Sequence, residues 1–178
     1  MKKAIFLDKD GTLVDNHGYP NIIPSDKIYF DKTTTGLKKF QDAGYLLIII
    51  SNQSWNSRGR LTKEEVDDIF SSIILQYLKK GVKINGFYYC PHQESDNCNC
   101  RKPKTELLEK AIRDFNINIK ESFIIGDSEH DIIAGKNIGL KTCLVMTGRG
   151  NSYKSNIKPD YKAGDINRIS EIIIRNNG

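Results

Sequence analysis

Three groups of polar residues have the types and spacing needed for metal-dependent chemistry on phosphate. They are residues 8–12 (DKDGT), residues 51–54 (SNQS), and Asp127 with Asp131 four positions later. Aspartates that converge in a buried place repel one another unless a cation lies between them. Hard carboxylate oxygens favour Mg²⁺ over softer metals. If the fold brings these groups together, they predict a magnesium site that binds a phosphorylated molecule.

Asp8 and Asp10 have the spacing for the two steps of phosphoryl transfer through the protein. Asp8 can attack phosphorus and form an aspartyl-phosphate once bound Mg²⁺ screens the repulsion between carboxylate and phosphate. Asp10 can protonate the leaving alkoxide and later take a proton from water, and Gly11 allows a close approach of the backbone. Taken alone, the two aspartates also fit a turn or a helix cap after a strand.

A second group of residues predicts a different metal site. Its four members are Cys90, His92, Cys98 and Cys100, in the pattern C-x-H-x5-C-x-C. Three thiolates and one imidazole match a closed, tetrahedral structural zinc site, whereas free thiols in a surface loop are the alternative. Four protein ligands leave no position for substrate, so we expect the zinc to organise the loop that continues into Arg101 and Lys102. Cys143 lies in an apolar stretch and is expected in the core.

Short apolar stretches alternate with amphipathic stretches along the chain. Strands are expected at 4–7, 45–51, 86–89, 122–126 and 141–146, and helices at 35–43, 62–80, 105–115, 131–137 and 166–175. This alternation is typical of βαβ units on a parallel sheet, whose ligands bind at the carboxyl ends of the strands. We therefore expect one α/β domain over residues 1–178, a doubly wound, three-layer, Rossmann-like parallel sheet. The three polar groups would then meet at one edge.

Composition excludes several classes of protein. The chain has 178 residues, 38% of them hydrophobic, and a net charge of +5 made of well-mixed charges. These values are typical of a globular protein with an anionic partner. The longest apolar run, residues 45–50, is too short to cross a bilayer, and the N-terminal stretch does not predict a secretory signal. We expect a cytoplasmic protein.

These motifs resemble those of the haloacid dehalogenase superfamily of phosphotransferases. Residues 8–12 match the first motif, D-x-D-G-T, and Ser51, Lys102 and the acidic pair at 127 and 131 match the other three in order. The resemblance implies that Asp8 is the nucleophile and Asp10 the general acid and base. It also implies that Ser51 and Lys102 bind the phosphoryl group.

The same resemblance implies how Mg²⁺ is held. Its ligands would be the side chain of Asp8, the backbone carbonyl of Asp10 and the side chain of Asp127. Asp131 would support the metal from outside the ligand set, with a helix cap as the alternative role.

Within this superfamily, the cysteine loop and the following C-R-K-P run resemble the D-glycero-D-manno-heptose 1,7-bisphosphate phosphatases. They also resemble the phosphatase domain of histidinol-phosphatase. About 35 residues separate Ser51 from Gly86, which leaves no room there for a cap domain. The resemblance implies that substrate is contacted by Asn16, His17, Gly18, Tyr19, Asn52, Gln53, Ser54 and Arg101. Trp55 and Ser128 depart from the heptose enzymes, which usually have glycine and often lysine at these places.

The function predicted is removal of the 7-phosphate from heptose 1,7-bisphosphate by a capless, monomeric phosphatase of carbohydrate metabolism and heptose biosynthesis. One alternative is a histidinol-phosphate phosphatase, although histidinol phosphate would gain nothing from Arg101. Another is a zinc-containing module that binds nucleic acid. Paired aspartates would repel its phosphates, and no basic stripe with stacking aromatic residues is present. The expected partner is therefore a small phosphorylated sugar, with no nucleic acid and no membrane.

Overall fold

A parallel sheet lies at the centre of the computed structural model, which describes residues 1–15, 32–55 and 57–177. The described strands are β1 (Ala4–Leu7), β2 (Leu46–Asn52), β3 (Gly86–Cys90), β4 (Phe123–Gly126), β5 (Lys141–Val145) and β6 (Tyr161–Ala163). The described helices are α1 (Thr33–Asp42), α2 (Lys63–Lys79), α3 (Glu106–Phe115), α4 (Glu129–Ile138) and α5 (Ile166–Asn177). The strand order is β3-β2-β1-β4-β5-β6, with every pairing parallel.

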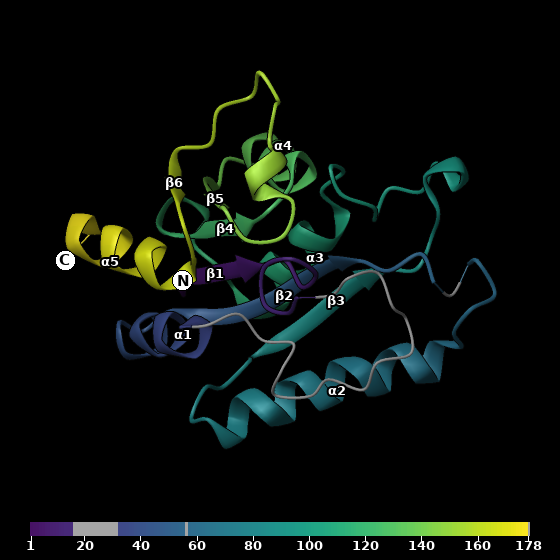
Figure 1. Cartoon of the computed structure of the whole chain (residues 1–178), viewed down its shortest axis with the longest axis horizontal. Coiled ribbons are helices and arrows are strands. Elements are labelled where there is room, and N and C mark those ends of the chain that lie inside the picture. Colours follow the sequence, from purple (N-terminus) through teal and green to yellow (C-terminus); the bar gives the residue numbers. More distant parts are fainter. Residues whose placement is uncertain (16–31, 56, 178) are drawn as a thin grey trace.

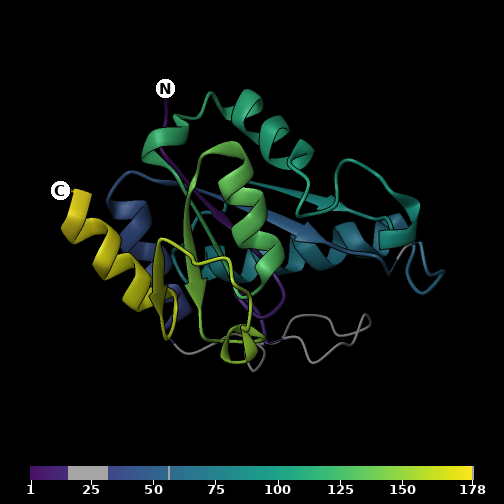
Figure 2. The same cartoon turned by 90° about the horizontal axis from the view of Figure 1, so that it is seen from above.

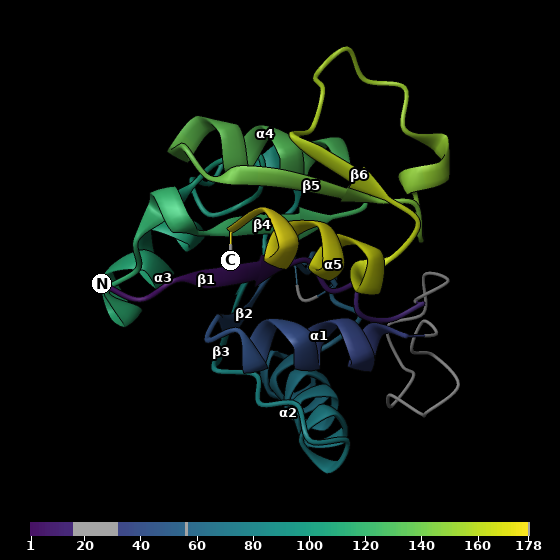
Figure 3. The same cartoon turned by 90° about the vertical axis from the view of Figure 1, so that its left-hand side faces the viewer.

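Helices cover both faces of this sheet (Figures 1 and 3). Helices α1, α2 and α5 bury Leu37, Phe70 and Ile169 in a core on one face. Helices α3 and α4 bury Leu108 and Ala134 in a second core on the other face. The doubly wound, three-layer α/β fold that the sequence predicts is therefore confirmed. In the described part of the chain, no helix is long and apolar enough to span a membrane.

Strand β1 shows why the strand sequences are apolar throughout. Ile5 and Leu7 contribute to one core, while Ala4 and Phe6 contribute to the other, and all four are fully buried. A strand covered on both faces needs apolar side chains in both directions. Helix α2, by contrast, buries side chains along one face only. It begins with a capping box between Thr62 and Glu65, as predicted.

The order in which the chain adds strands to the sheet reverses between β1 and β4. Strand β1 pairs with β2 on one side and with β4 on the other, so that Leu7 is level with both Ile49 and Ile125. The loops that follow the two central strands diverge at such a point and leave a crevice at the carboxyl edge. Asp8 follows β1 and Asp127 follows β4, so both start from this crevice. Figure 2 shows both chain ends on the side of the molecule opposite the loop that follows β3.

Several strands and helices start or end one or two residues from the predicted positions, and two differences have a clear physical reason. Strand β6 was not predicted, because it has three residues at the sheet edge and lacks an apolar run. Helix α4 begins at Glu129 rather than at 131, because the carboxylate of Asp131 accepts hydrogen bonds from the backbone N–H and hydroxyl of Ser128 and caps the first turn. The described residues between β2 and β3 form α2 and short flanking turns, as expected for a connection without a cap domain.

Hydrogen bonds between Thr142 in β5 and Asp160, the residue before β6, attach this edge strand to the sheet. The N–H and Oγ1 of Thr142 each donate to Asp160 Oδ2 at 2.7 Å, and the N–H of Asp160 donates to Thr142 Oγ1 at 3.1 Å. Thr142 is fully buried. We predict that Thr142→Val, which keeps the shape and removes two of these bonds, lowers the free energy of unfolding by about 1–3 kcal/mol.

Urea denaturation measures this loss. Thr35→Val, at an exposed position of α1, is the matched control and should change stability by less than about 0.5 kcal/mol. Equal stability of the two variants would show that the attachment contributes nothing.

Candidate active site

Lys102 lies at the centre of the candidate site, with a side chain only 3% exposed. Its ammonium donates to Asp8 Oδ1 at 2.7 Å, to Asp131 Oδ1 at 2.6 Å and to the carbonyl oxygen of Ile50 at 2.7 Å. Burial lowers the pKa of Lys102, but the charges of Asp131 and Asp8 outweigh burial and hold the pKa above its ordinary value. Lys102 therefore stays protonated and joins the ends of β1 and β2 to α4.

Asn52 fixes the backbone of this lysine. The side-chain amide of Asn52 donates to the carbonyl of Lys102 at 3.0 Å and accepts the N–H of Lys102 at 3.0 Å. The pair of hydrogen bonds links the end of β2 to the loop after β3. Holding the lysine is a role that the sequence did not predict for Asn52, and its predicted contact with substrate stays a prediction.

Asp127 is held by the loop that follows β5. Its Oδ2 accepts the backbone N–H of Arg149 at 2.7 Å, and Thr147 Oγ1 donates to the carbonyl of Gly11 at 2.7 Å. Gly148 has φ +51, and a Cβ there would lie 2.2 Å from Asp127 Oδ2 and 2.5 Å from the Cα of Gly11. Glycine is required at 148 because the backbone passes in contact with both the first and the fourth motif.

Three buried carboxylates share this edge of the sheet. Asp8, Asp127 and Asp131 each place one oxygen so that all three lie within 4.8 Å of one another. Burial raises the pKa of Asp8 to about 8, with Lys102 opposing the rise and the neighbouring aspartates adding to it. Burial likewise raises the pKa of Asp127 to about 6, against the hydrogen bond from Arg149 N–H. One ammonium is too little charge for three carboxylates, so a divalent cation with hard oxygen ligands fits the site.

Ser51 and Asp10 are joined through one glutamine. Gln53 Nε2 donates to Asp10 Oδ2 at 2.6 Å and to Ser51 Oγ at 2.9 Å. Ser51 is buried, whereas the side chain of Asp10 is 31% exposed. The structure therefore brings the four residues predicted as catalytic to one place, with Asp8 and Lys102 in direct contact.

The cysteines and the histidine of the loop after β3 converge as a tetrahedral metal site requires. The sulfur atoms of Cys90, Cys98 and Cys100 lie 3.1–3.5 Å apart, and His92 Nδ1 lies 3.2 and 3.7 Å from two of them. Ligands about 2.0–2.3 Å from a zinc ion are separated by roughly 3.5–3.8 Å, close to these values. The four side chains could thus hold one metal ion, whereas Cys143 is buried in β5 as predicted.

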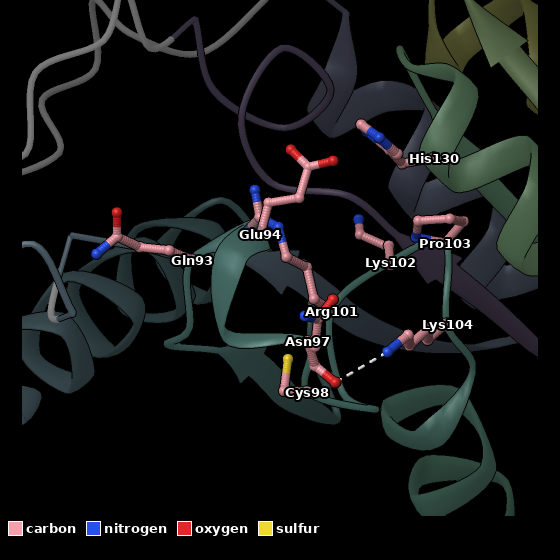
Figure 4. A pocket seen from close by; sticks show the side chains of 9 residues that line it. All are labelled: Gln93, Glu94, Asn97, Cys98, Arg101, Lys102, Pro103, Lys104 and His130. Atoms are coloured by element: carbon pink, nitrogen blue, oxygen red, sulfur yellow. Dashed lines mark hydrogen bonds between the residues drawn. The ribbon is translucent and has the colours of Figure 1, made fainter.

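Arg101 connects this cluster to a cavity of about 220 Å³ beside Lys102 (Figure 4). Its guanidinium donates to the carbonyl of His92 at 3.1 Å. The lining residues are Gln93, Glu94, Asn97, Cys98, Arg101, Lys102, Pro103, Lys104 and His130. The cavity therefore combines several basic side chains with a single carboxylate, that of Glu94, and suits an anionic group next to the carboxylate cluster.

Other residues predicted to contact substrate are distributed unevenly. Asn16, His17, Gly18 and Tyr19 lie outside the described residues. Ser54 begins the turn after β2, where its carbonyl accepts the N–H of Arg58 at 3.2 Å. In the same segment, the ring of Trp55 lies 5.3 Å from the guanidinium carbon of Arg60 and 5.9 Å from that of Arg58.

The loop of Thr147, Gly148 and Arg149 lies at this site, a role that the sequence prediction did not assign to it. Thr147 Oγ1 donates to the carbonyl of Gly11, 136 positions away, and the N–H of Arg149 donates to Asp127, 22 positions away. The T-G-R-G run directly after an expected strand was the available signal, because it puts a glycine at the carboxyl edge of the sheet.

Known proteins share both the sequence and the fold. A family model described as HAD-hydrolase-like matches residues 99–169. The D-glycero-beta-D-manno-heptose-1,7-bisphosphate 7-phosphatase of Pasteurella multocida is 35% identical over 180 residues, covering 97% of each chain. The enzyme of that name from Haemophilus ducreyi is 37% identical over 170 residues, covering 89% of this chain and 91% of its own.

A solved structure supports the same fold. The crystal structure of D,D-heptose 1,7-bisphosphate phosphatase from B. bronchiseptica, complexed with magnesium and phosphate, matches with a TM-score of 0.88. The match covers 98% of this chain and 99% of the other at 22% identity. Because relatives more than 30% identical match this chain over nearly its whole length, the chain belongs to the HAD-like hydrolases, in the family of the D-glycero-D-manno-heptose-1,7-bisphosphate 7-phosphatases.

Proposed function

We propose that this protein is a magnesium-dependent phosphatase that removes the 7-phosphate from D-glycero-D-manno-heptose 1,7-bisphosphate. The observation that carries the proposal is the contact between the Lys102 ammonium and Asp8 Oδ1 inside a cluster of buried carboxylates at the switch point of the sheet. The names of the curated relatives favour this substrate over histidinol phosphate and over nucleic acid. We also propose that the protein acts in the cytoplasm, where reduced thiols at Cys90, Cys98 and Cys100 stay available to bind a metal.

In the proposed first step, a carboxylate oxygen of Asp8 attacks phosphorus. A bond forms between this oxygen and phosphorus while the bond between phosphorus and the sugar oxygen breaks. Asp10 gives its proton to the departing alkoxide. Lys102 and Ser51 bind the phosphoryl oxygens, and the ammonium stabilises the negative charge that gathers there.

In the second step, a water molecule attacks the phosphorus of the aspartyl-phosphate. Asp10 takes the proton of the water, the bond to the Asp8 oxygen breaks, and phosphate leaves. The products of both steps are heptose 1-phosphate and inorganic phosphate. Asp8, the backbone carbonyl of Asp10 and Asp127 would hold Mg²⁺, with Asp131 behind them. The ion supplies charge neutralisation between carboxylate and phosphate.

The proposed role of the Cys90, His92, Cys98 and Cys100 cluster is structural. Zinc held there would fix the loop that delivers Arg101 and Lys102, and it would take no part in the reaction. Arg101 would read the distal phosphate or the sugar hydroxyls, because its planar guanidinium can donate two parallel hydrogen bonds. The other proposed contacts of the substrate are Asn16, His17, Gly18, Tyr19, Asn52, Gln53 and Ser54. We further propose a single domain that acts as a monomer.

The nucleophile is tested by Asp8→Asn, which keeps the shape of the side chain and removes the attacking charge. We expect the magnesium-dependent turnover to fall by about three orders of magnitude or more. Phosphate release measures the turnover, and circular dichroism checks the fold. Asp68→Asn, at an exposed position of α2, is the control. Near-normal turnover of Asp8→Asn would exclude an aspartyl-phosphate mechanism.

The contact of Gly148 with Asp127 predicts a strong effect of one methyl group. Gly148→Ala places a Cβ where Asp127 Oδ2 and the Gly11 backbone now lie, so the carboxylate must move. We expect activity to fall about tenfold or more and the Mg²⁺ concentration for half-maximal activity to rise. Gly164→Ala is the matched control, because a Cβ at 164 meets nothing within 4 Å. Unchanged Mg²⁺ dependence in Gly148→Ala would contradict this prediction.

The cysteine cluster predicts about one zinc ion per chain in protein purified without chelators. Cys98→Ser should lose zinc, lower the thermal midpoint and reduce activity, with little effect on Mg²⁺ dependence. Elemental analysis measures the metal. Cys143→Ala, which removes a cysteine outside the cluster, should keep its zinc. Wild-type protein without zinc would refute the proposed structural zinc site.

The role of Arg101 is tested by comparing two substrates. Arg101→Ala should reduce kcat/KM for the heptose bisphosphate about ten- to a hundredfold more than for p-nitrophenyl phosphate, because only the sugar substrate offers distal groups. Arg113→Ala, which removes a guanidinium from an exposed position of α3, is the matched control, and zinc content checks the loop. Equal losses on both substrates would mean that Arg101 does not read the sugar.

A further inference from the structure

The carboxylate of Asp10 receives a donor on each of its two oxygens. The ammonium of Lys9 forms an ion pair with Oδ1, and Gln53 Nε2 donates to Oδ2 at 2.6 Å. The two donors come from different segments, the turn after β1 and the end of β2. Rotation of the carboxylate would break at least one of these bonds, so its orientation is fixed.

Lys9 lies in a buried position, where an unpaired ammonium would be energetically unfavourable. Its side chain is 3% exposed, and burial of an ammonium is unfavourable unless it is paired. The ion pair with Asp10 and the face of the Phe70 ring, 5.8 Å from Nζ, provide the compensation. The carbonyl of Lys9 also accepts the N–H groups of Leu13 and Val14 at 2.9 and 3.1 Å, so the residue is held at both ends.

Gln53 is fixed as firmly. Its N–H donates to the carbonyl of Cys90 at 2.7 Å, and its side-chain amide also donates to Ser51 Oγ at 2.9 Å. The residue is 5% exposed. Its amide therefore connects Asp10 to the hydroxyl that the proposed mechanism places on the phosphoryl group.

We propose that Lys9 and Gln53 are positioning residues that aim the carboxylate of Asp10 at the attacking water of the second step. Donors on both oxygens suit the ionised carboxylate, which is the form that accepts a proton from water. In that step the water oxygen bonds to phosphorus, its proton goes to Asp10, and the bond to the Asp8 oxygen breaks. The inference rests on the proposed function, in which Asp10 acts on an aspartyl-phosphate.

Steady-state and rapid kinetics with p-nitrophenyl phosphate separate the two steps. Its leaving group departs without a proton, so kcat/KM reports formation of the phosphoenzyme and kcat includes its hydrolysis. In Lys9→Met and in Gln53→Met we expect kcat to fall about ten- to a hundredfold. KM should fall in proportion, so that kcat/KM is nearly unchanged. A burst of p-nitrophenol should appear, and intact-mass spectrometry after acid quenching should detect the phosphoenzyme.

Lys3→Met is the matched control. Lys3 also places its ammonium over an aromatic ring, at 4.4 Å from the centroid of Tyr45, but at the opposite end of β1. It should show wild-type kinetics. A parallel fall of kcat and kcat/KM in both Lys9→Met and Gln53→Met, without accumulated phosphoenzyme, would overturn the inference.

Asp10→Asn separates failure of this inference from failure of the proposed function. If Asp10→Asn accumulates phosphoenzyme and the two positioning variants do not, only the role of Lys9 and Gln53 is wrong. If Asp10→Asn forms no phosphoenzyme and keeps normal turnover, the proposed mechanism is wrong, and this inference with it.

Discussion

The buried ammonium of Lys102 is the interaction on which the rest of the site depends. It is the shared donor for Asp8, Asp131 and the Ile50 carbonyl, which belong to three different parts of the fold. Removal of one partner would leave an uncompensated charge in the interior, which is strongly unfavourable. The ends of β1 and β2 and the first turn of α4 are therefore held in one arrangement by electrostatics, before any substrate binds.

The loop after β3 carries Lys102 and must therefore be held in a fixed position. The loop must bring Lys102 to the crevice, yet between Cys90 and α3 its described residues contribute little apolar surface of their own. Two sets of contacts hold the loop instead. They are the paired hydrogen bonds between Asn52 and the Lys102 backbone, and the cluster of Cys90, His92, Cys98 and Cys100. A structural metal would replace the missing core, as it does in small domains.

Sequence reasoning found the parts of this site that depend on local rules. Apolar runs predicted β1 and β2. Because ligands of parallel sheets bind at the carboxyl ends of the strands, the sequence then predicted that Asp8, Ser51 and Asp127 would meet. It did not find β6, because three residues at an edge carry too weak a pattern. Nor did it find the contact of Gly148 with Gly11 and Asp127, because a close approach of distant backbones leaves no periodic trace in the sequence.

Ser128 and Trp55, where this chain departs from the heptose enzymes it resembles, have local roles in the structure. The hydroxyl of Ser128 donates to Asp131 Oδ2 at 2.5 Å, on the carboxylate whose other oxygen binds Lys102. Trp55 lies beside the guanidinium groups of its own turn. Among the described residues, Arg101, Lys104 and His130 line the cavity beside Lys102. In the proposed function, recognition of a distal anionic group would therefore depend on the cysteine loop, which carries Lys102, and on α4, whose Asp131 binds the Lys102 ammonium.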